Sequence, residues 1–310
     1  MHRALPLIVV AALTARAAGP ITLDNDTRDL VINVAGKPVL AYNIAVDESQ
    51  DPKQPLYRRS GYIHPIYDPA GRVITDDFPP DHMHQHAIFF AWTKCTFDGK
   101  PIDFWNQAGG KGTVAHTKLI ETSPTGFTAA LDHLDLRGGG PTPVLHETWT
   151  VRVHAAGDDY RIFDIESVQT CATDKPLVIE KYHYGGMAIR GARQWFHPAD
   201  PKSADMLTDA GKNRKEGNGA QCRWVDMYGE IDGKTSGIAV LCHPSNFRFP
   251  QPVRLHEDKP YFCFSPQVLG EFKIEPGKPY VSRYRYVVHM GKPDPAALDR
   301  LWDEYRQSVK

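Results

Sequence analysis

Three histidines stand at every second position of one segment, as His82, His84 and His86, directly after Asp81. Side chains two residues apart point to the same side of an extended chain, so this spacing predicts three imidazoles on one face. Imidazoles titrate near neutral pH and therefore serve as general acids and bases. Neutral ring nitrogens are also ligands for zinc and other divalent metals. The competing interpretation is that one or two of these residues are hydrogen-bonded structural histidines.

The residues around this triplet indicate where it lies in the fold. Prolines 79–80 cannot occupy a central strand, so they place the triplet at a strand entrance. The following run, residues 87–92, is apolar and aromatic enough to be a buried strand. We therefore expect an extended segment whose histidines project together at the mouth of that strand.

Two further ionisable residues are candidates for catalysis. Glu147 lies in an alternating segment beside Leu145, Trp149 and Val151. A carboxylate in such a place is costly to bury alone, so it needs an arginine, a histidine or a ligand as its partner. His183 lies in a segment rich in aromatic and ionisable residues and could act as acid, base or ligand. We expect the histidine triplet to act with Glu147 or His183 opposite it; a structural ion pair is the competing interpretation for Glu147.

The candidates for substrate binding are Asp81, Trp105, Arg190 and Asn246. A flat aromatic face stacks on the apolar C–H face of a sugar ring, and Trp105 precedes a polar, glycine-rich stretch. Arg190 offers a planar fork to a carboxylate or to polar oxygens, and glycines 185–186 before it permit close backbone approach to a ligand. Asn246 follows a strand in a polar turn. A bulged strand with a buried arginine is the competing interpretation for Arg190.

The composition indicates the class of partner. The chain has 310 residues, with 36 lysines and arginines against 37 aspartates and glutamates. This balance, without a basic run that includes aromatic residues, argues against nucleic acid or an anionic membrane as a partner. No serine-hydrolase, zincin or P-loop motif occurs. We expect the partner to be a small molecule, a carbohydrate.

The N-terminus has the pattern of a secretory signal. Arg3 precedes the apolar run Leu5–Leu13, and Ala15-Arg16-Ala17 is an A-x-A cleavage site. We predict residues 1–18 to be a signal peptide and the mature protein to be periplasmic or secreted. No later stretch is long and apolar enough to span a membrane. The five cysteines form no C-x-x-C pair, which leaves one or two disulfides open.

The remaining pattern is that of an all-β protein. More than a dozen short strand-like segments are separated by turn residues, and only residues 293–309 have helical spacing of their apolar side chains. Residues 197–220 are polar and predict a long loop. We expect residues 19–310 to form a single β-sandwich domain of two large antiparallel sheets, with a C-terminal helix.

Several segments together carry a family resemblance. They are Pro79-Pro80-Asp81-His82-x-His84-x-His86, Asp103-Phe104-Trp105, Gly185-Gly186-x-x-x-Arg190, Trp224-Val225-Asp226 and His243-Pro244-x-Asn246. They resemble a family of secreted bacterial proteins of unknown function labelled "methane oxygenase PmoA-like", although Ala87 replaces the usual glycine after the last histidine. The label does not transfer, because that oxygenase subunit spans the membrane and this chain has no spanning segment. The resemblance implies an exported protein associated with carbohydrate breakdown, with a large sandwich (supersandwich) like that of galactose mutarotase.

These observations favour an exported carbohydrate-active enzyme that uses histidine and glutamate as acid and base on a sugar or an oxidised glycoside. Hydrolysis, elimination and epimerisation all remain open, since each needs an acid and a base near neutral pKa. The alternative is a non-catalytic carbohydrate-binding sandwich, and a third interpretation is a structural or protein-interaction domain. No cofactor is certain; a divalent metal would be held by His82, His84 and His86.

Overall fold

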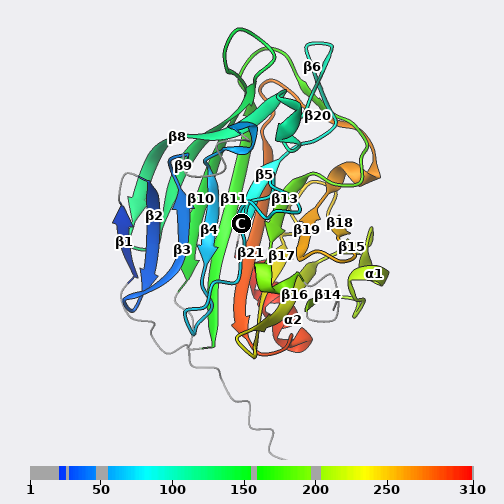
Figure 1. Cartoon of the computed structure of the whole chain (residues 1–310). Coiled ribbons are helices and arrows are strands. Elements are labelled where there is room, and N and C mark those ends of the chain that lie inside the picture. The colour runs from blue at the N-terminus through cyan, green and yellow to red at the C-terminus, as the bar shows by residue number, and fades with distance from the viewer. Residues whose placement is uncertain (1–20, 26–27, 47–54, 155–158, 197–203, 309–310) are drawn as a thin grey trace, which may run out of the picture.

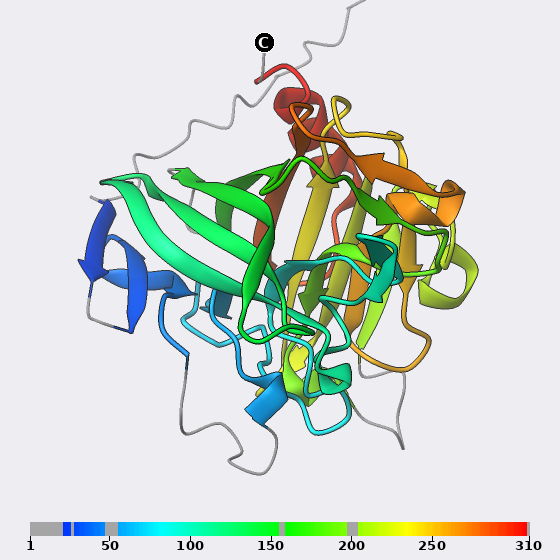
Figure 2. The ribbon, with the colours of Figure 1, turned by 90° about the horizontal axis from the view of Figure 1, so that it is seen from above.

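The computed structural model describes residues 21–25, 28–46, 55–154, 159–196 and 204–308. Two large antiparallel sheets pack face to face and dominate these residues (Figures 1 and 2). The predicted all-β sandwich is therefore confirmed. The predicted signal peptide, residues 1–18, lies outside the described residues.

The first sheet has nine strands and carries the histidine segment. Its centre is formed by three neighbouring strands, β5, β13 and β19, that come from distant parts of the chain. In spatial order the strands are β1 (Ile21–Asn25), β2 (Asp29–Val34), β3 (Lys37–Asn43), β4 (Tyr62–Ile66), β5 (Ile88–Ala91), β13 (Gly186–Arg190), β19 (Tyr261–Phe264), β18 (Gln251–Leu255) and β15 (Gln221–Cys222).

The second sheet has eight strands, most of them long. In spatial order they are β14 (Ala204–Thr208), β16 (Trp224–Ile231), β17 (Lys234–Cys242), β21 (Tyr280–Met290), β11 (Tyr160–Cys171), β10 (Thr142–His154), β9 (Gly126–Asp135) and β8 (Gly112–Ser123). A small sheet stands at one end of the sandwich, with β20 (Phe272–Ile274), β12 (Leu177–Ile179), β6 (Cys95–Phe97) and β7 (Lys100–Ile102).

The alternating pattern of β10 explains how the two large sheets meet. Leu145, Trp149 and Val151 are buried, whereas the intervening His146 and Arg152 are exposed. Successive strand residues point to opposite faces, so one face of β10 enters the core and the other faces solvent. One cluster of buried apolar side chains connects the strands of both large sheets.

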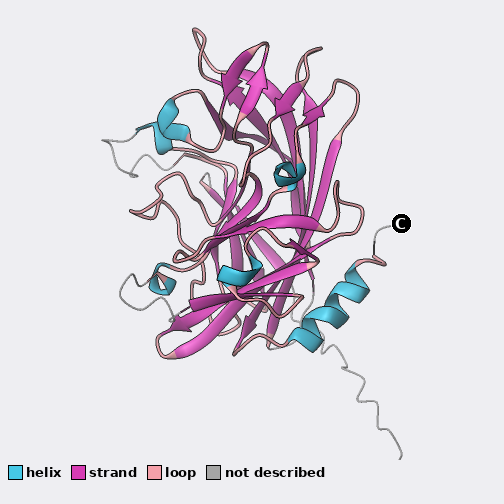
Figure 3. Ribbon diagram, turned by 90° about the vertical axis from the view of Figure 1, so that its right-hand side faces the viewer, coloured by secondary structure: helices cyan, strands magenta, loops and turns pink. Residues whose placement is uncertain are grey.

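Helices lie at the periphery of the ribbon (Figure 3). The C-terminal helix α2 (Pro295–Tyr305) confirms the predicted helix; the side chain of Asp294 caps it by accepting a 3.0 Å hydrogen bond from Ala297 N. Leu298 and Trp302 pack it against the eight-stranded sheet. The short helices are η1 (Pro55–Tyr57), η2 (Gln107–Gly109), η3 (Arg193–Trp195), α1 (Arg214–Gly217) and η4 (Pro266–Leu269).

Residues 197–203 lie outside the described residues, and the long loop predicted at residues 197–220 is wrong from residue 204 on. There the chain forms β14, which pairs with β16, and the one-turn helix α1. Asn213 caps α1 by accepting hydrogen bonds from two backbone N–H groups. Polar composition alone reveals neither this local cap nor the pairing of β14 with a distant strand. No helix among the described residues has the length and apolarity needed to cross a bilayer.

Candidate functional site

The histidine triplet lies in turns before β5 and is not part of an extended strand. His82 N donates to Pro79 O at 2.9 Å, and Gln85 N donates to His82 O at 2.8 Å. The strand begins only at Ile88. The prediction of an extended segment at the strand entrance is therefore wrong, and the two-residue spacing does not put the three rings on one face.

The central strands of the nine-stranded sheet have an inner and an outer face. Phe90 of β5 and Phe264 of β19 contact Tyr280 and Tyr284 of the opposite sheet, so they mark the inner face. Their neighbours in sequence point the other way. The register places Phe89, Ala188, Arg190, Tyr261, Cys263 and Arg254 on this outer face.

Three histidines gather over the outer face. The ring centroids of His82 and His84 are 5.3 Å apart, and that of His256 lies 5.9 Å from His82. His256 follows β18 in the connection to β19, and its ring also contacts Tyr261. Three segments far apart in sequence thus supply one group, which we call the outer-face cluster (His82, His84, His256, Tyr184 and Tyr261).

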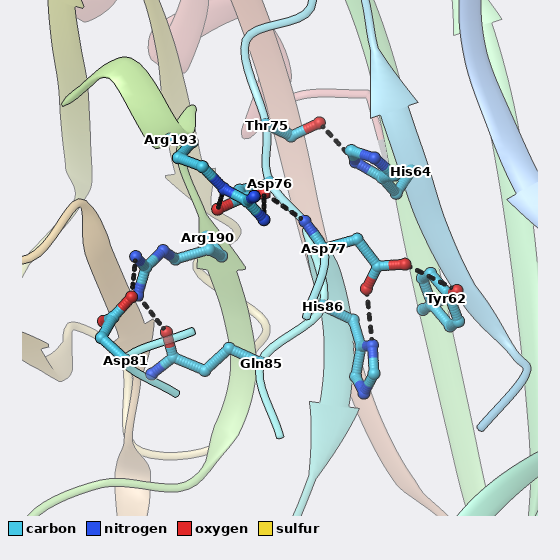
Figure 4. A network of polar contacts seen from close by, with 10 residues as sticks. All are labelled: Tyr62, His64, Thr75, Asp76, Asp77, Asp81, Gln85, His86, Arg190 and Arg193. Carbon is cyan, nitrogen blue, oxygen red and sulfur yellow. Dashed lines mark hydrogen bonds and ion pairs between the residues drawn. The ribbon is translucent and has the colours of Figure 1, made fainter. Parts of the chain in front are cut away.

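A buried arginine and an aspartate hold the turn of His82 in place. Arg190 donates two hydrogen bonds to the carboxylate of Asp81, at 2.8 and 2.9 Å, and a third to Gln85 Oε1 (Figure 4). The Nδ1 of His82 lies 3.1 Å from the same carboxylate. Burial opposes ionisation of Asp81, but the hydrogen bonds from His82 and Arg190 outweigh it and hold its pKa well below the usual range.

This arrangement fixes the tautomer of His82. An ionised carboxylate only accepts hydrogen bonds, so Nδ1 of His82 carries the hydrogen and Nε2 keeps its lone pair. Asp81 and Arg190 were expected to bind substrate. Instead, Arg190 is fully buried and its terminal nitrogens are engaged by Asp81 and Gln85, so both residues position His82.

The other two histidines of the cluster are neutral at pH 7. Burial, followed by repulsion from His82 and His86, lowers the pKa of His84 to about 4. Burial, followed by the charges of Lys259 and Arg254, lowers the pKa of His256 to about 4. Neutral imidazoles can both donate and accept hydrogen bonds, which suits contact with hydroxyl groups.

Aromatic residues flank the histidines. The ring of Trp105 lies 5.2 Å from Tyr184 and 6.0 Å from Tyr261. Trp105 is only 2% exposed, so it supports the cluster and does not offer the open face that the sequence predicted. Tyr184 is partly exposed, makes an edge-on ring contact with Tyr182 and donates a 3.1 Å hydrogen bond to Asn106. Burial raises the pKa of Tyr184 to about 12, so its hydroxyl stays protonated.

The glycine pair before Arg190 has a packing role. Both residues have positive φ, 132° for Gly185 and 103° for Gly186. A Cβ on Gly185 would lie 2.5 Å from Gln267 Oε1, and one on Gly186 would lie 2.5 Å from Phe264 O. The close approach expected for a ligand is therefore made by the protein itself.

His86 lies deeper in the protein than His82 and His84. Its ring is fully buried among Tyr62, Phe78 and Phe89, and its Nδ1 lies 2.7 Å from Asp77 Oδ1 (Figure 4). Asp77 also accepts a 2.8 Å hydrogen bond from Tyr62 OH. Burial raises the pKa of Asp77 to about 7. We call His86 and Asp77 the interior pair.

Glu147 is also an interior residue. Its carboxylate lies 2.7 Å from His133 Nε2 and accepts hydrogen bonds from Trp149, Ser167 and Gln169. Burial opposes ionisation, but these contacts, that of His133 first, lower the pKa of Glu147. The sequence predicted an arginine, a histidine or a ligand as the partner of Glu147, and the structure has a histidine, in the form of a structural pair. Glu147 is not part of the outer-face cluster.

The two remaining candidates differ in their place. His183 is exposed and its ring lies 4.8 Å from that of Tyr184, so it stands at the border of the outer-face cluster. Asn246 lies elsewhere: it accepts a hydrogen bond from Arg283 N and donates one to Arg283 O of β21. Its amide is used to fix a turn to the eight-stranded sheet, and the predicted role in substrate binding has no support there.

The three predicted metal ligands, His82, His84 and His86, are not grouped in the described residues so as to hold a metal ion. Within the part of the chain that the structure describes, no three His, Cys, Asp or Glu side chains are arranged to hold one metal ion. His256 was missed by the sequence analysis. It is a lone histidine in a charged turn, and only the tertiary fold brings it to His82.

Comparison with known proteins gives a family and weak structural likenesses. Residues 29–303 match a family described as "Family of unknown function (DUF6807)". No curated protein matches the sequence. The heparan sulfate lyase HepC from Pedobacter heparinus is similar with a TM-score of 0.38 and 11% identity, over 90% of this chain but 36% of the lyase. A protein described as a "putative mutarotase (YeaD)" from Salmonella typhimurium has a TM-score of 0.31 and 9% identity, over 88% of this chain and 90% of its own. The label "methane oxygenase PmoA-like" is not among these findings.

Proposed function

The chain belongs to this family of unknown function, and from its own geometry we propose that it is a carbohydrate-active enzyme whose outer-face cluster performs acid–base chemistry on a sugar. The observation that carries the proposal is the arrangement around His82. A partly exposed imidazole is oriented by a carboxylate, which is itself clamped by a buried arginine, and two neutral histidines stand beside it.

His82 is the base in this proposal. Its Nε2 keeps a lone pair because Nδ1–H is directed at Asp81, and the ionised Asp81 stabilises the imidazolium that forms when Nε2 takes a proton. His84, with its pKa lowered to about 4 by burial and by neighbouring histidines, stays neutral and orients the substrate by hydrogen bonding. The protonated hydroxyl of Tyr184 is a second donor.

A sugar suits the other groups of the site. Tyr182 and Tyr184 present aromatic rings at a partly exposed position, and His84, His256 and Asn106 add neutral donors and acceptors. Aromatic rings with neutral hydrogen-bonding groups match a polyol with apolar C–H faces. The signal-like residues 1–18 support a periplasmic or secreted location for this activity.

A panel of sugars tests the proposal. Glycosides, 3-keto-glycosides and uronosides would be incubated with the full chain and followed by proton NMR, which detects hydrolysis, elimination and epimerisation alike. We expect turnover of at least one class, lost in His82→Gln. Sugar binding that saturates without any turnover, and that survives His82→Gln, would favour the non-catalytic binding protein instead.

A further inference from the structure

Arg254 is a cation without an acidic partner at the border of the outer-face cluster. It lies on β18 directly opposite Cys263 of β19, so its side chain belongs to the outer face. The side chain is half-buried, and its Nη1 donates a long hydrogen bond of 3.3 Å to Leu255 O. Among the described residues no carboxylate lies within ion-pairing distance of Arg254, whereas nearby Arg190 has Asp81.

The charge of Arg254 acts on the site itself. It lowers the pKa of His183 after the effect of burial, and it contributes to the lowered pKa of His256. It also acts on the buried hydroxyl of Tyr261. The guanidinium is therefore near enough to act on both His183 and the outer-face cluster.

The carboxylates near the site are already used. Asp81 is bound by Arg190 and His82. Asp103 accepts hydrogen bonds from Thr93 and Asn106 and from two backbone N–H groups. Asp258 lies 3.2 Å from His256 Nδ1, at the exposed tip of the connection that also carries Glu257. The positive charge of Arg254 is thus left to face a ligand.

We propose that Arg254 binds a negatively charged group on the substrate, which makes acidic sugars such as uronic acids the preferred substrate class. This inference rests on the proposed function and narrows its substrate from sugars in general to acidic sugars. A guanidinium offers a planar pair of N–H donors that matches a carboxylate in two parallel hydrogen bonds. Half-buried, it is less screened by water than a surface arginine, so the discrimination between an acidic and a neutral sugar is strong.

Matched sugars and variants test the assignment. Calorimetry would compare methyl glucuronide, methyl glucoside and a sulfated methyl glucoside on the full chain, on Arg254→Gln and Arg254→Lys, and on the control Arg152→Gln. Arg152 is an exposed arginine on β10 of the other sheet. A hydrogen bond to a charged group contributes about 1.5–3 kcal/mol, so we expect the acidic sugar to bind about 10- to 100-fold more tightly than the neutral one.

The variants distinguish a failure of the Arg254 assignment from a failure of the proposed function. Arg254→Gln removes the preference without weakening the neutral sugar, Arg254→Lys restores part of it, and Arg152→Gln changes nothing. A preference for the sulfated over the carboxylated sugar would keep Arg254 as the anion site but replace the uronate by a sulfate ester. Equal affinities for acidic and neutral sugars, unchanged in Arg254→Gln, would overturn the inference and leave the proposed function standing. Failure of all three sugars to bind, with none of the wider panel turned over, would overturn both.

Discussion

The outer-face cluster and the interior pair are built from the same residue types and have opposite properties. His82 and His86 each have an Nδ1 held by an aspartate, at 3.1 and 2.7 Å. His82 is partly exposed and its aspartate is clamped by Arg190, whereas His86 is fully buried and surrounded by aromatic rings.

The difference shows which histidines are free to react. An aspartate that is kept ionised by an arginine orients its histidine and leaves the second nitrogen for a substrate. Asp77, whose pKa burial raises to about 7, instead holds a histidine that is fully buried among aromatic rings. We therefore assign chemistry to the outer-face cluster and stability to the interior pair, although the sequence places both within one short segment.

The largest expected effect concerns the interior. Glu147→Ala leaves the buried His133 and three further hydrogen-bond donors without their acceptor, and each buried donor left unsatisfied costs about 1–3 kcal/mol. Urea unfolding measures this loss. Glu121 is an exposed glutamate of the same sheet, so Glu121→Ala is the control and leaves stability nearly unchanged. Full stability of Glu147→Ala combined with lost turnover would make Glu147 catalytic and remove the distinction between the two regions.

The second effect is on turnover. His82→Gln removes the proposed base, and general base catalysis contributes about 10²–10⁴-fold, so kcat falls by that factor while the melting temperature stays close to that of the wild type. His146→Gln is a matched control, because His146 is an exposed histidine whose Nδ1 lies 2.7 Å from Asp132 on the other sheet. Equal turnover in the two variants would contradict the role of His82.

The third effect is a titration. Histidine NMR signals should show His84 and His256 protonating at about pH 4, because burial and neighbouring positive charges disfavour the imidazolium. Removing His82 removes one repulsive neighbour, so the pKa of His84 rises in His82→Gln. Since both folded pKa values lie below the unfolded value of about 6.5, the unfolded chain binds more protons in between, and stability falls as the pH drops from about 6.5 to 4. Midpoints near 6.5 would mean that the cluster is open to water.

The smallest effect separates stacking from hydrogen bonding. Tyr184→Phe keeps the ring and loses the hydroxyl that donates to Asn106, so sugar affinity falls by less than about tenfold, as expected for one neutral hydrogen bond. Tyr184→Ala also loses the aromatic face and binds more weakly still. Equal affinities of the two variants would show that the ring does not contact the sugar.

Local patterns predicted the fold because they are properties of neighbouring residues. The alternation in β10 and the spacing of apolar residues in α2 depend on which side chains face the core, and both were confirmed. The prediction that Glu147 has a hydrogen-bonding or ionic partner was also correct, since burying a carboxylate alone is costly wherever it lies. What the sequence could not show is that the partner is His133 and that the pair is interior.

The site was harder to predict because it depends on turns and on distant segments. The spacing of the histidine triplet implies one face only for an extended chain, and hydrogen bonds from His82 N to Pro79 O and from Gln85 N to His82 O turn it instead. His256 reaches His82 only through the connection of β18 and β19. Neither fact follows from composition or periodicity.

The most direct test of the account compares His84→Gln with His86→Gln in one experiment. Both variants replace a histidine of the same segment, and each is assayed for urea unfolding and for turnover of the best sugar of the panel. The account predicts that His84→Gln loses turnover and keeps its stability, whereas His86→Gln loses about 1–3 kcal/mol of stability because it removes the 2.7 Å contact between the fully buried ring and Asp77. A stable but inactive His86→Gln beside a fully active His84→Gln would contradict it.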